Sequence, residues 1–199
     1  MNAARLLCTA MLGLSPALGA AADCCCPAPA AAPAVSSRSL YQLDATWTDD
    51  AGQPYRLAEL RGRPVVLAMF FSSCGYACPR IVSDMTRIRE TLPVAVRNRA
   101  RFVLVSFDDV RDTVPLLHAY REQHALPSGS WVLLRGGPDD VRELAAVLGV
   151  KYKRDGAGMF QHSNLITVLN PEGEIVHQRA GLEGGLAAAV QAVVASNAR

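Results

Sequence analysis

Two cysteines four residues apart are the residues of this sequence best suited to chemistry. Cys74 and Cys78 enclose Gly-Tyr-Ala, precede Pro79 and follow an apolar run of strand length. Because a thiolate is both a nucleophile and a soft metal ligand, the pair suits thiol–disulfide exchange or the binding of Cu(I) or Zn(II). The spacer between the cysteines is one residue longer than in the redox-active Cys-x-x-Cys motif. The longer spacer lets the two sulfurs lie apart around an ion, while a disulfide remains possible. A buried disulfide with a purely structural role is the alternative.

A metal ion held by two thiolates needs a third ligand, and the chain contains four histidines. His118 and His124 fall within or at the end of an expected helix, and His177 falls in an expected strand. Surface or capping roles explain these three. His162 precedes a later strand and is the ligand that we favour. The methionines near the site are expected in the core rather than on the metal: Met69, Met85 and Met159.

Alternating strand and helix patterns surround these residues. Continuous apolar runs predict buried strands, and apolar residues at helical spacing predict helices. The expected elements are a hairpin over 46–57, a strand over 65–71, a helix from Pro79, a strand over 102–107, a helix over 113–124, a strand over 131–134, a helix over 139–148, a hairpin over 165–178 and a helix over 186–195. This order predicts an α/β, thioredoxin-like fold with parallel central strands, an N-terminal β-hairpin extension and a central insertion. In the helix over 113–124 we expect Leu116, Leu117 and Tyr120 to point inward.

The expected fold explains how distant residues can meet. The cysteine pair lies where a buried strand joins a helix, and the N–H groups and dipole of a helix start favour thiolate over thiol. In a thioredoxin-like fold the loop before the strand at 165–169 faces this junction. Oxidoreductases usually place a cis-proline in that loop, whereas this chain has Phe160-Gln-His162-Ser163. A histidine there favours metal capture over passage of a peptide substrate.

Four segments of the chain are together similar to those of a known family. The chain resembles the SCO/SenC copper chaperones of respiratory oxidase assembly, roughly from Leu40 to Leu182, in segments 70–79, 106–113, 131–134 and 162–163. The resemblance implies copper bound as Cu(I) by Cys74, Cys78 and His162. It implies delivery to the binuclear copper centre of an oxidase subunit or to a similar apo-cuproprotein. It also implies an exported protein close to a membrane, acting as a metallochaperone rather than as an enzyme.

The chain departs from the family pattern at two places. Family members often carry an acidic residue between the cysteines, where this chain has Gly-Tyr-Ala, and a proline where this chain has Asp109. Asp108, Arg111 and Asp112 still match the second family motif. They belong either to a loop near the metal site or to an ion-paired turn that caps the following helix.

A thiol–disulfide reductase that reduces the target's cysteines before metallation is the alternative function. In that case Cys74 and Cys78 form a redox-active pair and His162 is dispensable, because disulfide exchange requires only an attacking thiolate and a resolving thiol. A peroxidase is not expected, because Phe71 and Gly75 stand three residues before the cysteines, where that chemistry needs Thr or Ser.

Residues 1–22 are predicted to form a signal peptide, with Arg5 ahead of an apolar segment at 6–18 and small residues before position 23. The apolar segment is shorter than the ~20 residues of a membrane span, so we expect cleavage, with an uncleaved anchor as the alternative. Residues 23–38 hold the triplet Cys24–Cys26 and a Pro/Ala-rich tether, and the thioredoxin-like domain covers 39–199. The triplet is either a metal-collecting tail or incidental. We expect an exported, periplasmic protein, soluble or tethered to the inner membrane.

Composition excludes other classes of protein. The 199 residues include 20 Lys and Arg against 18 Asp and Glu, for a net charge of +2. With this balance and no Lys/Arg cluster, we expect no nucleic-acid partner. Half of the residues are hydrophobic, which is enough for one well-packed domain. Cleavage of the signal would leave five of the six cysteines, and an odd number does not fit a disulfide scaffold.

Overall fold

The computed structural model describes residues 36–155 and 159–197, which lie in the second of two compact units, Val35–Arg199. The expected signal peptide and most of the expected tether, with Cys24–Cys26, lie outside the described residues. The elements in chain order, with η for a 3-10 helix, are η1 (Leu40–Gln42), β1 (Trp47–Asp49), β2 (Pro54–Tyr55), η2 (Leu57–Leu60), β3 (Val65–Phe70), α1 (Ala77–Thr91), α2 (Val94–Arg99), β4 (Arg101–Ser106), α3 (Val114–Gln123), β5 (Trp131–Arg135), α4 (Pro138–Leu148), β6 (Tyr152–Arg154), β7 (Phe160–His162), β8 (Leu165–Leu169), β9 (Ile175–Ala180) and α5 (Ala187–Asn197).

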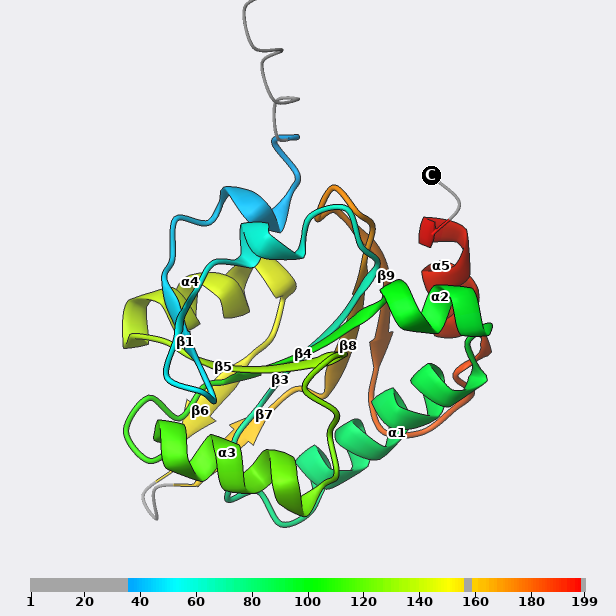
Figure 1. The fold of residues 1–199 in the computed structure, drawn as a ribbon. Helices are drawn as coiled ribbons and strands as arrows, with labels where there is room; N and C mark the ends of the chain where they lie inside the picture. Colours follow the sequence, from blue (N-terminus) through cyan, green and yellow to red (C-terminus); the bar gives the residue numbers. More distant parts are fainter. Residues whose placement is uncertain (1–35, 156–158, 198–199) are drawn as a thin grey trace, which may run out of the picture. The chain divides into compact units, whose positions relative to one another are not determined.

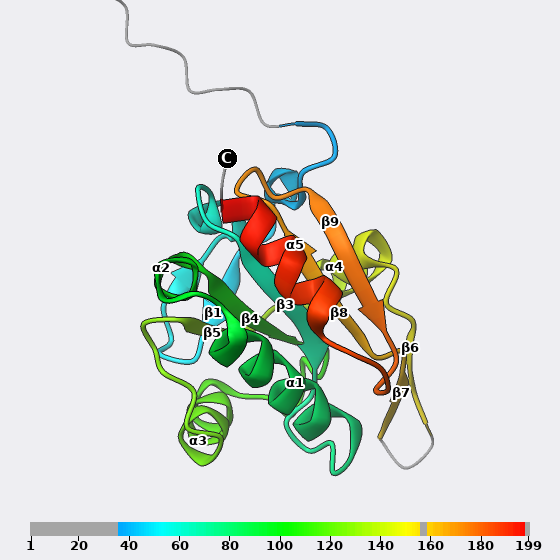
Figure 2. The ribbon, with the colours of Figure 1, turned by 90° about the vertical axis from the view of Figure 1, so that its right-hand side faces the viewer.

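A seven-stranded sheet forms the centre of the domain, with the strand order β2-β1-β5-β4-β3-β8-β9. β3, β4 and β5 run parallel, while β8 pairs antiparallel with β3 and β9 pairs antiparallel with β8. α1 and α5 cover one face of the sheet and α4 the other (Figure 1 and Figure 2). This is the expected thioredoxin-like arrangement, and the antiparallel pair β1–β2 is the expected N-terminal extension, joined to the sheet through β5.

β3 is the strand that leads into the cysteine loop, and all six of its side chains are buried. Its strand neighbours β4 and β8 lie on either side, and helices cover both faces of the sheet. A strand without a water-facing side is apolar without alternation, as this one is. Burial of each large apolar side chain contributes about 1.5–3 kcal/mol, so the strand is a firm base for the loop. α1 begins at Ala77, and Pro79 loses no helical hydrogen bond because it lies in the first turn.

A second, two-stranded sheet carries His162, and the sequence did not predict its strands. β6 and β7 pair antiparallel, with Tyr152 opposite His162. They lie within the expected central insertion, between α4 and β8. Each strand has three residues, and Tyr-Lys-Arg lacks the apolar alternation that predicts strands. His162 therefore ends a strand instead of lying in a loop.

Two side-chain expectations were wrong. Leu116 is 42% exposed, because Leu117 and Tyr120 alone among the three form the buried face of α3. Met159 is 36% exposed just before β7, at the surface of the small hairpin, whereas Met69 and Met85 are buried as expected. The six-residue helix α2 was also not predicted, since it is too short to show a helical period.

Candidate metal centre

The cysteine loop places one thiol near the surface and one in the interior. Cys74 is half-buried, whereas Cys78, the second residue of α1, is fully buried. Both are free thiols. The backbone N–H of Cys78 donates to Cys74 Sγ over 3.4 Å. The first N–H groups of a helix lack partners within the helix, so they can stabilise a thiolate at this position.

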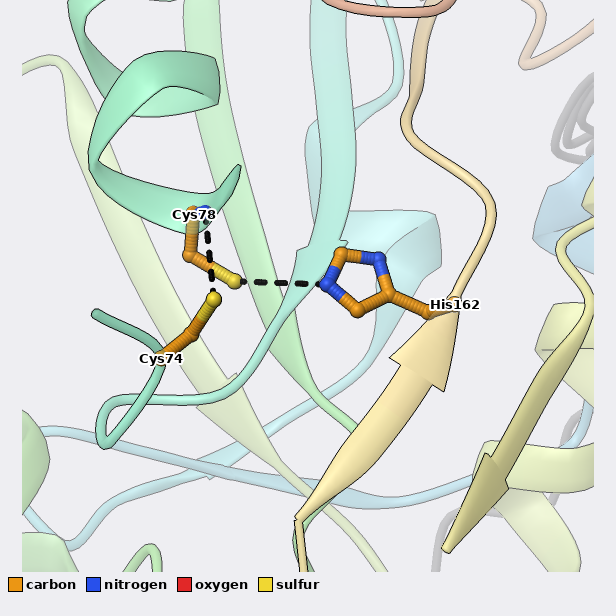
Figure 3. Close-up of side chains that lie close together, drawn as sticks. All are labelled: Cys74, Cys78 and His162. Carbon is orange, nitrogen blue, oxygen red and sulfur yellow. Dashed lines mark hydrogen bonds between the residues drawn. The ribbon is translucent and has the colours of Figure 1, made fainter. Parts of the chain in front are cut away.

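His162 points its Nε2 atom at the cysteine pair. Nε2 lies 3.7 Å from Cys78 Sγ, and the ligand atoms of Cys74, Cys78 and His162 all lie within 4.8 Å of one another. The cysteines come from the start of α1 and its preceding loop, and the histidine comes from the end of β7 (Figure 3). His162 Nδ1 lies 3.2 Å from the carbonyl oxygen of Ser163. Because a carbonyl only accepts, Nδ1 carries the proton and Nε2 keeps its lone pair toward the thiols.

These separations fit a three-coordinate metal site. Bonds of about 2.3 Å to sulfur and about 2.0 Å to nitrogen, with 120° between them, place two ligand atoms roughly 3.7–4.0 Å apart. The separation of Cys78 Sγ and His162 Nε2 already has this value, 3.7 Å. Two thiolates and an imidazole form a soft ligand set that suits Cu(I), and Zn(II) also accepts it.

Aromatic rings hold the imidazole of His162 in place. The ring centroids of Phe107 and Phe71 lie 5.0 and 5.8 Å from that of His162. Phe160 packs against both of these phenylalanines, and Tyr152 stacks on Phe107 with centroids 5.3 Å apart. Rings at such separations are in contact. The imidazole is therefore fixed by the main domain as well as by its own strand.

The two thiols differ in acidity. Burial acts to raise the pKa of Cys74. Hydrogen bonds from the backbone N–H groups of Cys78, Tyr76 and Ala77 and from the Cys78 thiol outweigh burial, so that the pKa of Cys74 is lowered. Burial raises the pKa of Cys78 far above its ordinary value. Burial also lowers the pKa of His162. At neutral pH the metal-free site therefore holds a protonated Cys78, a neutral imidazole and, in Cys74, the more acidic thiol.

A buried carboxylate ties the cysteine loop to the end of β4. Asp112 accepts a hydrogen bond from the backbone N–H of Ser72 at 3.0 Å. It also accepts from the hydroxyl groups of Ser72 and Ser106. Ser72 lies two residues before Cys74, so these bonds fix the start of the cysteine loop. Thr113, the N-cap of α3, makes no side-chain capping bond, so the family motif belongs to a loop near the site rather than to a helix cap.

Asp108 lies in the loop that follows β4 and joins this loop to the hairpin that carries His162. Its side chain is buried and pairs with Arg111 and, at 3.2 Å, with Arg154 of β6. The Arg154 guanidinium also lies over the ring of Phe160, 4.8 Å from its centroid. Pairing offsets the cost of burying the carboxylate charge. The ion-paired turn thus exists, and it braces the histidine side of the site.

The SCO1/SenC family model matches residues 35–195, a stretch that contains the cysteine pair, the histidine and both braces. The chain belongs to the SCO1/SenC family. It is 28% identical over 151 residues to a Stutzerimonas stutzeri protein named as copper-binding, an alignment that covers 73% of this chain and 72% of the relative. It is 22% identical over 141 residues to the SCO1 protein homolog of Bacillus subtilis, an alignment that covers 69% of this chain and 72% of that relative.

Crystal structures confirm the expected fold of this SCO1/SenC protein. A protein of Aquifex aeolicus described as an electron transfer protein superimposes with a TM-score of 0.72 at 21% identity, over 82% of this chain and 95% of that one. Arabidopsis thaliana ScoI with copper bound superimposes with a TM-score of 0.65 at 22% identity, over 76% of this chain and 94% of that one. Yeast Sco1 with copper bound gives 0.63 at 20% identity, over 76% and 84%. Among residues 36–155 and 159–197, no helix is long and apolar enough to cross a membrane.

The remaining histidines lie away from the site. His118 is exposed, with Nδ1 3.9 Å from a carboxylate oxygen of Asp50. His124 packs on the ring of Tyr120, and His177 lies within β9. Among the described residues, none of these three belongs to the candidate ligand group of Cys74, Cys78 and His162.

Four residues that support the site were not recognised from the sequence: Ser72, Ser106, Tyr152 and Arg154. Both serines lie in segments that resemble the family, but no spacing links Ser72 to its partner Asp112, which is forty residues away in the chain. Tyr152 and Arg154 alternate in the chain, as Phe160 and His162 do, and alternate residues of a strand face the same side. Over strands of only three residues this period of two is too weak a signal to predict the hairpin.

Proposed function

We propose that this SCO1/SenC protein is a copper-binding metallochaperone with Cu(I) as its cargo. The observation that carries the proposal is the convergence of Cys74, Cys78 and His162 within 4.8 Å. The Stutzerimonas stutzeri relative is named for copper binding, and two structures of the same fold are described with copper bound. Two thiolates and an imidazole are soft ligands that Cu(I) prefers.

Each ligand has its own task when the ion is loaded. Cys74 is half-buried and has the lower pKa, so it offers the first thiolate to an arriving ion. Cys78 releases its proton as the ion binds, because the metal then supplies the stabilisation that the interior denies to a bare thiolate. His162 adds its Nε2 lone pair, with the ring held by the Ser163 carbonyl. The exchange changes neither the oxidation state of copper nor that of the sulfurs.

We further propose delivery of the ion to the binuclear copper centre of an oxidase subunit or a similar apo-cuproprotein, in the periplasm. Family membership and the expected signal peptide over 1–22 support this proposal. A Sco protein of the same fold, BsSco, is described as a member of a family of cytochrome c oxidase assembly proteins. Thiolates on both partners would make the transfer an exchange of like ligands that needs little driving force. The mass of the exported protein tests the location, since cleavage after Ala22 removes the first 22 residues.

A copper titration tests the three-ligand site. The protein for this test is the full chain with Cys8 and Cys24–Cys26 changed to serine, so that Cys74 and Cys78 are its only thiols. We call it the two-thiol chain. When reduced, it should bind one Cu(I) ion in competition with a chromophoric Cu(I) chelator.

Single substitutions in the two-thiol chain identify the ligands. Cys74→Ser, Cys78→Ser and His162→Ala should each weaken copper binding by about 10–100-fold or more, which is the effect of losing even an outer-shell partner. His118→Ala is the matched control and should bind as the parent does, because His118 lies outside the ligand group. Unchanged binding by His162→Ala would refute the three-ligand site.

The asymmetry of the two thiols favours a reductase as the second candidate function. Cys74, with the lowered pKa, would attack one sulfur of a target disulfide and release the other as a thiolate. Cys78 would then lose its proton and attack Cys74 Sγ, leaving a reduced target and an oxidised Cys74–Cys78 pair. His162→Ala should keep this activity toward an oxidised two-cysteine peptide, yet fail to load copper into an apo-cuproprotein. Full oxidase assembly in cells carrying His162→Ala, with none in Cys74→Ser, would favour the reductase over the chaperone.

A further inference from the structure

Five arginines gather at the end of the large sheet where β3 and β4 begin. They lie just before β3, in the last turn of α2 and at the start of β4: Arg61, Arg63, Arg97, Arg99 and Arg101. We call these five residues the arginine cluster. The expectation that the chain has no Lys/Arg cluster was wrong here, because the two segments that form the cluster are 37 residues apart in the sequence where they touch.

Main-chain contacts join the two segments of the arginine cluster. The Arg99 guanidinium donates to the carbonyl oxygen of Gly62 over 3.2 Å. The backbone N–H of Arg101 donates to the carbonyl oxygen of Pro64 over 2.9 Å. Burial, and then the positive charge of Arg63, lower the pKa of Arg101, so the two like charges act on each other. The fold therefore holds these positive charges side by side.

The arginine cluster has no acidic partner within the described part of the chain. Arg61, Arg63 and Arg99 are exposed, and Arg97 and Arg101 are half-buried. None of the five forms an ion pair with a residue in 36–155 or 159–197. The sequence contains no Asp or Glu at 60–83 or at 91–107. Like charges held together without acidic partners repel one another, and an anionic ligand relieves that repulsion.

The glutamates near this end of the domain do not cancel the cluster. Glu174 is paired with Arg38 over 3.3 Å. Glu59 accepts a hydrogen bond from a backbone N–H in the cap of η2. Glu90 directly follows an arginine in the last turn of α1. Glu59 and the exposed Glu172 thus remain against five arginines, so this end keeps a positive net charge.

The first described residues of the chain lie at the same end as the arginine cluster. The backbone N–H of Leu40 donates to the carbonyl oxygen of Gly173, in the turn between β8 and β9, over 2.9 Å. The backbone N–H of Gly62 donates to the carbonyl oxygen of Pro171, in the same turn, also over 2.9 Å. The predicted signal peptide, or the anchor that is its alternative, belongs to residues 1–35, which are therefore attached beside the cluster.

The candidate metal centre lies at the opposite end of the sheet. β3 and β4 run parallel, so both begin at the arginine cluster, and the cysteine loop follows the end of β3. The six residues of β3 span about 20 Å, at about 3.3 Å per residue. Figure 1 and Figure 2 show the start of the described chain and the start of α1 at opposite ends of the domain. A surface that binds the cluster therefore leaves the metal centre open.

We infer that the arginine cluster docks the domain on a membrane surface of anionic phospholipid, with the candidate metal centre turned away from the lipid. Arginine binds phosphate groups through paired hydrogen bonds. Each basic residue near an anionic membrane strengthens binding by about fivefold. A lipid surface is favoured over an acidic protein, because the segment predicted to reach a membrane is attached beside the cluster. The inference concerns the opposite end of the molecule from the proposed copper site and does not depend on copper.

The test measures binding of the two-thiol chain to sedimented lipid vesicles. One set of vesicles is phosphatidylcholine alone, and the other contains about 30% phosphatidylglycerol, which makes the surface anionic. The ratio of the two affinities is the quantity compared, because the apolar segment at 6–18 contributes to binding of both sets. Urea unfolding of each variant shows that the domain is folded.

Three variants separate the cluster from the overall charge. The test variant replaces the three exposed arginines of the cluster with glutamine: Arg61→Gln, Arg63→Gln and Arg99→Gln. The control variant makes the same charge change at exposed positions in and beside the β6–β7 hairpin: Arg142→Gln, Lys151→Gln and Lys153→Gln. A third variant has lysine at 61, 63 and 99 and keeps the charge.

The parent should bind the anionic vesicles about tenfold or more tightly than the neutral ones, and added salt should remove the difference. The test variant should lose about tenfold or more of its affinity for the anionic vesicles, since it lacks three charges worth about fivefold each. The control should stay within about twofold of the parent, and the lysine variant should keep most of the parent affinity. On the vesicles, Cys74 should react with iodoacetamide as fast as in free solution.

Several results would overturn the inference. An equal loss in the test and control variants would mean that only overall charge matters. Slower alkylation of Cys74 on the vesicles would mean that the metal centre faces the lipid. A test variant that keeps its vesicle affinity but loses affinity for soluble polyglutamate would assign the cluster to an acidic protein.

Hydrogen exchange of the vesicle-bound parent decides the matter without any substitution. Protection should rise at 61–63 and 97–101 and should not change in the cysteine loop. The opposite pattern would contradict the inference even if the test variant failed to fold. Copper binding is measured separately, so a failure of the docking surface leaves the proposed function standing, and a chain that binds lipid but no copper overturns only the proposed function.

Discussion

The hydroxyl of Ser72 offers the sharpest test of how the cysteine loop is held. Asp112 accepts one bond from this hydroxyl and one from the hydroxyl of Ser106. The two serines thus donate to the same carboxylate from two neighbouring segments: Ser72 from the cysteine loop that follows β3, and Ser106 from the end of the adjacent strand β4. Replacing either serine with alanine removes one hydrogen bond to a buried charge, which is worth about 1.5–3 kcal/mol. Ser106→Ala also deprives the backbone N–H of Asp108 of its acceptor, at 3.0 Å, so it should cost at least as much stability.

Copper affinity should separate the two variants. In Ser72→Ala the start of the cysteine loop loses one of its two bonds to Asp112 and regains backbone freedom. Ordering one residue costs about 1–2 kcal/mol, which corresponds to about 5–30-fold in an equilibrium constant. Copper binding should therefore weaken by about fivefold or more. Ser106→Ala leaves the loop bonds in place and should change copper affinity by less than about twofold.

The assay uses both variants in the two-thiol chain. Urea unfolding followed by circular dichroism gives the free energy of unfolding, and competition with a Cu(I) chelator gives the affinity. The reasoning fails if the two variants lose copper affinity equally, or if Ser72→Ala loses stability without losing affinity. The first result would mean that copper affinity does not depend on the Ser72 bond in particular, and the second that Asp112 stabilises the domain without positioning Cys74.

Three further predictions concern other parts of the chain. Cys74 should react with iodoacetamide faster than Cys78, and from a lower pH than a free thiol does. The reason is that Cys74 is half-buried with a lowered pKa, while Cys78 is buried with a raised pKa. Mass spectrometry of the singly alkylated two-thiol chain locates the label, and a label on Cys78 contradicts the prediction. Arg121→Ala should destabilise the domain by about 3–5 kcal/mol in a urea titration, because it leaves the buried carboxylate of Asp50 without its bidentate partner; a loss below about 1 kcal/mol would show that water reaches that carboxylate. If Cys24–Cys26 collect copper, changing all three to serine should slow copper loading at low copper without altering the final affinity, whereas identical loading rates would mark them as incidental.

The sequence predicted those parts of the site that depend on local patterns. The apolar run over 65–71 places the cysteine pair at the end of a buried strand, and the start of α1 follows from Pro79 and the residues after it. His162 was found by its place before β8 rather than by its surroundings. Its structural reason is the hairpin β6–β7, whose polar three-residue strands carry too weak a signal to be predicted.

The contacts that hold the site together could not be predicted, because they join distant segments. The bond between Ser72 and Asp112 spans forty residues, and the pair of Asp108 with Arg154 spans forty-six. Each contact is made by a single residue of a common type, so no spacing in the sequence predicts these contacts. Met159 was misplaced for a related reason, since an apolar side chain beside a short hairpin has no core to enter.

The three candidate ligands belong to two separate hydrogen-bonded ladders, and this separation has a thermodynamic consequence. The cysteines follow a strand of the seven-stranded sheet, whereas His162 ends a strand of the two-stranded one. The hairpin is joined to the main domain by stacked rings and by Arg154, not by strand pairing. A substitution in the hairpin can therefore shorten the time that an ion stays bound while leaving the unfolding free energy of the domain almost unchanged. The residence time of a bound ion and the stability of the fold are in this way separately adjustable.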